Sequence, residues 1–222
     1  EPVLLEARAL LERTGRPRLV AMAHGGAALF HAARGRPDDA YRELQAALEL
    51  HRVAGAEGNV LSALGSLADG MWMRGDLDRA IRLARDALEQ HRQSPFSGRV
   101  SQAYAAANLF GMLVEHRDLA EAQAMGRRLL PELRELGIAH GWTDHYASWL
   151  ARSGSIDSAV RLIGWADALR LARGLRRQPN EERARDATLA LARAVAPAVD
   201  VDRWLAEGAA LSQQDALGLA RS

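Results

Sequence analysis

The chain has 222 residues, of which 29 are basic and 28 acidic, and it contains neither cysteine nor lysine. The lack of cysteine excludes disulfides, thiolate zinc sites and thiol nucleophiles, and a formal net charge of +1 gives no indication of nucleic acid or an anionic membrane as partner. Alanine, leucine and arginine dominate, which is typical of a helical protein, and no apolar run approaches the roughly 20 residues of a membrane span.

The first segment, EPVLLEARALLERTG, has no basic flank and no signal-peptide core. Its apolar spacing predicts a helix over Pro2–Arg13, which we interpret as the second helix of an incomplete repeat within residues 1–16. We therefore expect the chain to be part of a longer protein.

Four similar units follow over residues 17–174. In each, a turn with an acidic residue precedes an alanine, and the alanines are spaced by 40, 42 and 37 residues: Ala40, Ala80, Ala122 and Ala159. A helix with apolar spacing of three and four follows each alanine. Another helix precedes each turn, and we expect these at Val20–Ala33, Val60–Arg74, Val100–Glu115 and about His140–Ser153.

Residues at fixed offsets explain each unit. Glycine at the turn can take the left-handed conformation that ends a helix, and it is present at Gly35, Gly75 and Gly154 but replaced by Arg117 in the third unit. We expect carboxylates in the first turn of the next helix, at Asp38, Asp78, Asp118 and Asp157. His51 and His91 recur at helix ends, where we interpret them as partners of the helix dipole rather than as ligands.

A helix–turn–helix unit of this kind resembles the tetratricopeptide repeat, and LSALGSLADGMWMRGDLDRAIRLARDALEQ, residues 61–90, fits that pattern closely. The resemblance implies an all-α fold, a right-handed α-solenoid with a C-terminal helical cap. We expect a single domain over residues 1–222, made of the partial repeat at 1–16, four repeats at 17–174 and the cap at 175–222.

The longer units and the tail are similar to the C-terminal regulatory arrays of LuxR-type and antibiotic-regulator ATP-binding transcription regulators of bacteria. The tail combines Ala-x-Arg-Leu-x-Gly-x-Ala, beginning at Ala159, with Trp-x-x-Glu-Gly-x-x-Leu, beginning at Trp204. The resemblance implies a non-enzymatic, cytoplasmic sensor domain that binds a protein, a peptide or a small-molecule effector. The alternative is a stand-alone protein-interaction scaffold unrelated to transcription.

In such arrays the first helices of successive units line the concave face, which predicts a binding groove. Its candidate residues are Trp72, Tyr104, Asn108, Asp144 and Arg152. Aromatic rings supply apolar contact, and the charged groups could orient a polar ligand. The pattern leaves Trp72 open between the groove and the core.

Two further clusters have a structural and a functional interpretation. His140, Asp144 and His145 could bind a metal, but catalytic zinc usually needs three protein ligands, so we favour a His–Asp pair on one helix. The arginines between Arg170 and Arg185 alternate with acidic residues, which favours a solvated surface over a nucleic-acid interface. We expect no catalytic residue, no cofactor, no metal and no nucleic-acid contact.

Overall fold

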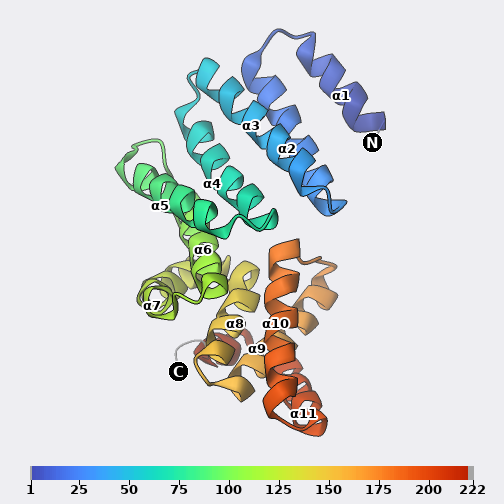
Figure 1. Cartoon of the computed structure of the whole chain (residues 1–222), viewed down its shortest axis with the longest axis vertical. Helices are drawn as coiled ribbons and strands as arrows, with labels where there is room; N and C mark the ends of the chain where they lie inside the picture. Colours follow the sequence, from blue (N-terminus) through green and yellow to red (C-terminus); the bar gives the residue numbers. More distant parts are fainter. Residues whose placement is uncertain (1, 220–222) are drawn as a thin grey trace. The chain divides into compact units, whose positions relative to one another are not determined.

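The computed structural model describes residues 2–219, with the backbone alone given at residues 2, 4, 5, 8, 139 and 140. Regular structure within that range is helical throughout, which confirms the all-α repeat fold (Figure 1). The backbone packs as two compact units: unit 1 ends at Met112 and unit 2 begins at Leu113. A single domain over residues 1–222 stays a prediction.

Unit 1 is a row of antiparallel helices in which each helix packs on the next one along the chain, from α1 to α5 (Figure 1). Its elements are α1 (Pro2–Glu12), α2 (Pro17–Ala33), α3 (Pro37–Val53), α4 (Glu57–Met73), α5 (Leu77–Gln93) and most of α6 (Arg99–His116). The helix predicted at the start of the chain and the first helices of the first three units are therefore present, with ends within a few residues of those expected.

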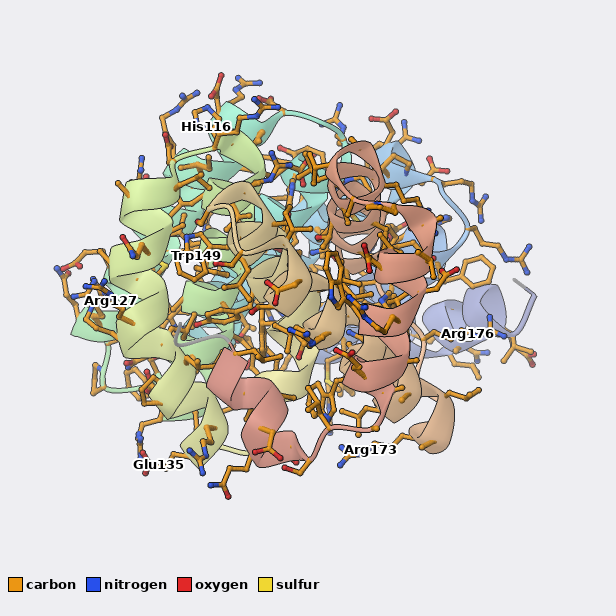
Figure 2. The ribbon with its side chains drawn as sticks, turned by 90° about the horizontal axis from the view of Figure 1, so that it is seen from below. His116, Arg127, Glu135, Trp149, Arg173 and Arg176 are labelled. Carbon is orange, nitrogen blue, oxygen red and sulfur yellow. The ribbon has the colours of Figure 1, made fainter. Side chains whose placement is uncertain are left out.

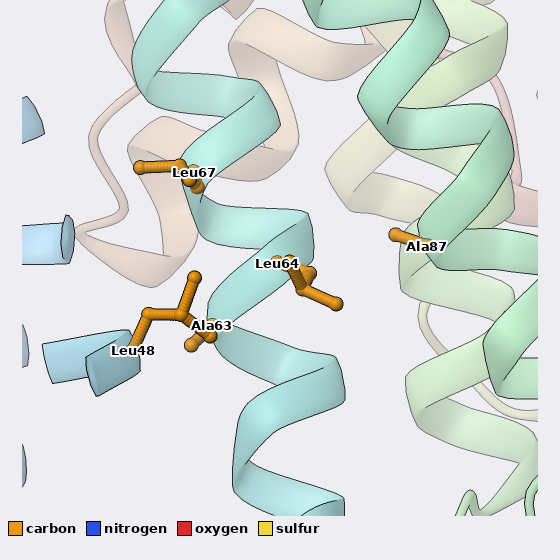
Figure 3. Close-up of a cluster of buried hydrophobic side chains, with 5 residues drawn as sticks. All are labelled: Leu48, Ala63, Leu64, Leu67 and Ala87. Carbon is orange, nitrogen blue, oxygen red and sulfur yellow. The ribbon is translucent and has the colours of Figure 1, made fainter. Parts of the chain in front are cut away.

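The core of unit 1 lies between α3, α4 and α5. Figure 3 shows Leu48 from α3 and Ala87 from α5 on either side of the α4 residues Ala63, Leu64 and Leu67. The repeated alanines are fully buried, with an exposed fraction of 0% at Ala40, Ala80, Ala122 and Ala159. Small side chains at these positions allow neighbouring helices to approach closely, as the repeat pattern predicts.

The turns between paired helices use left-handed backbone. Gly35, Gly75 and Gly154 have φ angles of 67°, 84° and 97°, and Arg117 takes the same conformation with φ 71°. No other non-glycine residue among residues 2–219 has a positive φ. The third unit therefore keeps the turn geometry without the glycine that makes it easy.

The carboxylates after these turns lie close to where the repeat pattern puts them. Asp38, Asp78 and Asp157 are in the first turns of their helices, as predicted. Asp118 lies two positions earlier in its repeat, at the N-cap of the following helix, and its Oδ2 is 2.9 Å from Nδ1 of His116.

His51 and His91 lie at helix ends as predicted, and their role as partners of the helix dipole stays a prediction. Both lie in the last turn of their helices, and burial lowers the pKa of each imidazole, which disfavours its charged form. Nδ1 of His91 is 2.7 Å from Oγ of Ser97, whereas Nδ1 of His51 has no hydrogen-bond partner among the described residues. Their recurrence reflects equivalent positions in the core.

Unit 2 continues the helical pairing. Its elements are α7 (Leu119–Glu135), a 3-10 helix η1 (Ala139–Trp142), α8 (Thr143–Arg152), α9 (Ile156–Arg173), α10 (Pro179–Val195), α11 (Ala198–Ala209) and α12 (Gln213–Leu219). The first helix of the fourth unit is shorter than predicted, because η1 occupies its first turn. In the predicted cap, α10 packs on α8, while α11 and α12 pack on α9.

The two motifs of the tail meet where α9 crosses α11. A Cβ added to Gly164 would lie 2.2 Å from the carbonyl oxygen of Leu205, and one added to Gly208 would lie 2.0 Å from that of Arg161. Beside this crossing, Arg161 donates from Nε to Glu207 Oε2 over 2.7 Å. The glycines therefore let the two backbones touch, and the ion pair fixes their register.

Candidate functional site

Unit 1 exposes apolar side chains on the first helices of its repeats. On α2, Met22 is 59% exposed and Leu29 is 72% exposed, and a spacing of seven residues puts them on one face. They precede Ser62 and Asp69 of α4 by the repeat distance of 40 residues. We call this surface, with Tyr104 and Asn108 of α6, the first-helix face.

Asp69 and Asn108 join α4 to α6 on this face. The Asn108 side-chain amide donates from Nδ2 to Asp69 Oδ2 over 2.6 Å, while Asp69 Oδ1 is buried without a hydrogen-bond partner among the described residues. Burial raises the pKa of the Asp69 carboxyl to about 7. Near neutral pH this group is therefore present in both its protonated and its ionised forms.

The candidate residues of unit 1 differ in accessibility. Trp72 is only 1% exposed, so its ring belongs to the core and is not open to a partner. Tyr104 is 45% exposed and is available at the surface. Asn108 is half-buried and held by Asp69. The binding role predicted for these residues stays a prediction.

The candidate residues of unit 2 lie on α8. Asp144 is fully buried and accepts hydrogen bonds from Arg170 Nη2 at 3.0 Å, Arg177 Nε at 3.1 Å and Arg177 Nη2 at 3.0 Å. Among the described residues the partners of Asp144 are therefore arginines; the predicted pair with His140 is not tested, because the His140 side chain lies outside the described residues. Arg152 is half-buried, and its Nε donates to Ser148 Oγ over 3.4 Å.

The ion pairs around Asp144 extend over three helices. Arg177 also contacts Asp167 at 2.5 Å, and Asp167 contacts Arg185 at 2.9 Å. Burial would raise the pKa of Asp167, but these two arginines outweigh it and hold that pKa below its usual value. The resulting network ties α8 to α9 and to α10, and it was not evident from sequence because the partners are up to 33 residues apart.

The arginine-rich segment therefore does not form one solvated surface. Arg170 and Arg177 belong to the buried network, which corrects the prediction for them. Arg173 and Arg176 are exposed as predicted, and Figure 2 shows both at the edge of the molecule with their side chains directed outward.

His145 is buried beside this network. Burial, followed by the charges of Arg183 and Arg170, lowers the pKa of its imidazole to about 3, so the ring is neutral at physiological pH. Within the described residues no group of three His, Asp or Glu side chains could hold a metal ion. The arrangement here favours a packed polar core over acid–base chemistry.

One family comparison bears on this architecture. Residues 19–93 match the tetratricopeptide repeat family. The matched segment contains nearly all of α2 and all of α3, α4 and α5, the two complete hairpins of unit 1. No curated protein matches the chain.

Repeats of this family form scaffolds for protein–protein interaction, and the match over residues 19–93 indicates a scaffold of that kind. The exposed side chains of α2 belong to it, which makes the first-helix face its candidate binding surface. None of the helices in the described part of the chain has the length and apolarity needed to cross a bilayer.

Proposed function

We propose that this chain is the partner-sensing arm of a larger bacterial transcription regulator and works in the cytoplasm as one helical array. A protein or peptide partner binds the first-helix face of the tetratricopeptide repeats, and the DNA-binding and ATP-binding functions belong to other parts of the protein. Binding shifts the array between two states for which the partner has different affinities, and this shift controls assembly of the regulator.

The observation that carries the binding function is the exposed apolar surface on α2. Met22 and Leu29 are exposed on a helix whose adjoining face is buried through Ala21 and Ala28. Leaving large apolar side chains in water gives up the stabilisation that burial would provide, so their exposure on one face of a matched repeat favours a partner that covers them.

The tail supports the regulator context. Its two motifs resemble those that end the arrays of LuxR-type and antibiotic regulators, and in this chain Gly164 and Gly208 form one close crossing. Because the two motifs form the contact between α9 and α11, they belong to the folded array. This is expected if they mark the end of a regulatory array of that family.

Among the candidate residues, the geometry favours Tyr104 for direct contact and Asn108 for fixing a polar group. Trp72 lies inside unit 1 beneath this surface, whereas Asp144 lies inside unit 2. In this proposal they position neighbouring helices and do not touch the partner.

The full reading frame tests the regulator context. A phosphate-binding loop and a DNA-binding segment encoded together with this chain are expected. Their absence would refute the sensor role and leave a protein-interaction scaffold.

The binding face is tested with the remaining domains of that protein, expressed separately. Tyr104→Ala and Leu29→Ser should weaken their association with this chain, while Arg82→Ala on the exposed side of α5 should not. Equal affinities for all three variants, with unchanged thermal stability, would show that the partner binds elsewhere.

A further inference from the structure

One surface of unit 2 combines arginines from three elements with one carboxylate. Arg183 of α10 lies with Nη2 3.6 Å from Oε2 of Glu115, near the end of α6. Arg117 occupies the turn between α6 and α7, and Arg152 lies at the end of α8. Arg117, Arg183 and Glu115 are exposed and Arg152 is half-buried. We call these four residues the arginine surface.

Arg152 is the least solvated arginine of this surface and has unused donors. Its Nε bonds to Ser148, and its two Nη groups have no partner among the described residues. Burial and then the charge of Arg117 lower the pKa of this guanidinium, while Glu115 raises it. The Arg152 side chain is thus held in a position where an additional negative charge would stabilise it.

Arg117 is held there at a cost in backbone conformation. It is the one described non-glycine residue with a positive φ, at a turn where three other repeats have glycine. Non-glycine residues in the left-handed region are strained, and such strain concentrates at functional sites. The Arg117 backbone N–H donates to the Val114 carbonyl, but its side chain makes no hydrogen bond or ion pair within the described residues, so no side-chain contact offsets the strain.

The charges of this surface are unbalanced. The surface has three guanidinium groups and one carboxylate, Glu115, which contacts Arg183 and whose charge acts on Arg152, while the neighbouring Asp118 is paired with His116. In the Asp144 network, by contrast, buried arginines and carboxylates alternate in direct contact. An external anion would correct the imbalance at the arginine surface, whereas the buried network needs none.

We propose that the arginine surface binds an acidic segment of a partner protein, with successive Asp or Glu carboxylates placed on Arg152, Arg183 and Arg117. Guanidinium groups donate in a planar fork that suits carboxylates. Their distribution over a turn and two helices fits an extended chain with several carboxylates better than one small anion. In this arrangement Glu115 competes with the partner for Arg183. The site belongs to unit 2 and does not depend on the first-helix face of unit 1.

The experiment measures binding of a fluorescein-labelled hexaglutamate peptide to the whole chain by anisotropy, at low salt and at physiological salt. Arg152→Gln should weaken binding by about tenfold, as expected for a half-buried charge-assisted contact, and Arg183→Gln by about threefold, as expected for an exposed one. Arg173→Gln and Arg176→Gln are the matched controls, because they remove the same charge from exposed positions of the same unit. Weakening by the controls equal to that of Arg152→Gln would overturn the proposal.

Two further variants separate binding from stability. Arg117→Gly should weaken binding by about threefold and at the same time raise the melting temperature, because it relieves the left-handed strain. Glu115→Gln should strengthen binding by a similar factor, because Arg183 loses its internal competitor. Loss of binding accompanied by loss of stability in Arg117→Gly, or weaker binding in Glu115→Gln, would contradict the arrangement.

Competitors distinguish the ligand chemistry. Unlabelled hexaglutamate should displace the probe, whereas citrate, inorganic phosphate and a single-stranded oligonucleotide at matched charge should displace it less well. A small anion or the oligonucleotide that competes better, with the same dependence on Arg152, would overturn the assignment to an acidic peptide. No binding of hexaglutamate at low salt would overturn the site itself, and the test of unit 1 with Tyr104→Ala would be unaffected.

Discussion

Replacing Gly164 by alanine probes the crossing of α9 and α11. The added Cβ would lie 2.2 Å from the Leu205 carbonyl oxygen, and since ordinary contact begins at 3.4 Å, the helices must separate by about 1 Å. Overpacking typically costs about 1–3 kcal/mol, and here the obstructing atom is backbone, which moves only with its helix. Alanine regains about 1 kcal/mol through helix propensity. We therefore expect a net loss of about 2 kcal/mol, or about 4–8 °C in melting temperature for a chain of this length.

Urea and thermal unfolding followed by circular dichroism would measure this loss. Gly65→Ala is the matched control, since Gly65 also lies within a helix but a Cβ there meets no atom within 4 Å. The control should be neutral or gain about 0.5–1 kcal/mol from propensity alone. The double variant Gly164→Ala, Gly208→Ala should cost less than the sum of the single changes, because one separation relieves both clashes. If Gly164→Ala were as stable as the control, the close crossing would be refuted.

Further predictions concern individual side chains. Arg117→Gly should stabilise the chain by about 1 kcal/mol in urea unfolding, and Gly75→Arg should destabilise it by a similar amount, because each changes the strain of a left-handed turn. Equal stability of both variants would contradict this. Asp144→Asn should cost about 3–5 kcal/mol because it leaves buried arginines uncompensated, whereas Asp76→Asn at an exposed pair should cost at most about 1 kcal/mol. Burial raises the pKa of Asp69 from 3.8 to about 7. Between these pH values the carboxyl is protonated in the folded chain and ionised in the unfolded chain, so the free energy of unfolding falls as the pH rises through them. The stability difference between the wild type and Asp69→Asn should therefore fall between about pH 4 and pH 7, and a constant difference would show that Asp69 has an ordinary pKa.

The sequence alone predicted the helices, the turns and the repeat. This worked because apolar spacing, turn glycines and small residues such as Ala40 and Ala80 act over one or two helical turns. The same pattern also recurs at the repeat spacing, so each unit supports the assignment of the next. It also indicated that Arg117 was exceptional, although only the backbone angle shows that the residue adopts the glycine conformation.

The partners of charged and polar side chains were decided by the tertiary structure. Asp144 was predicted to pair with a histidine four residues away, and among the described residues it contacts Arg170 and Arg177 on other elements, because a buried carboxylate needs several strong donors and only packing brings them together. Trp72 could not be assigned to core or groove from spacing, since both sides of a helix in a stacked array can be apolar.

The same reason applies to the tail glycines. Their pattern was visible in the sequence, but nothing in the order of residues stated that Gly164 and Gly208 face each other. Local propensity determined where this protein is helical, because it depends on neighbours along the chain. The packing of α9 on α11 and the charges around Asp144 and Glu115 depend on contacts between distant residues, which exist only once the helices are stacked.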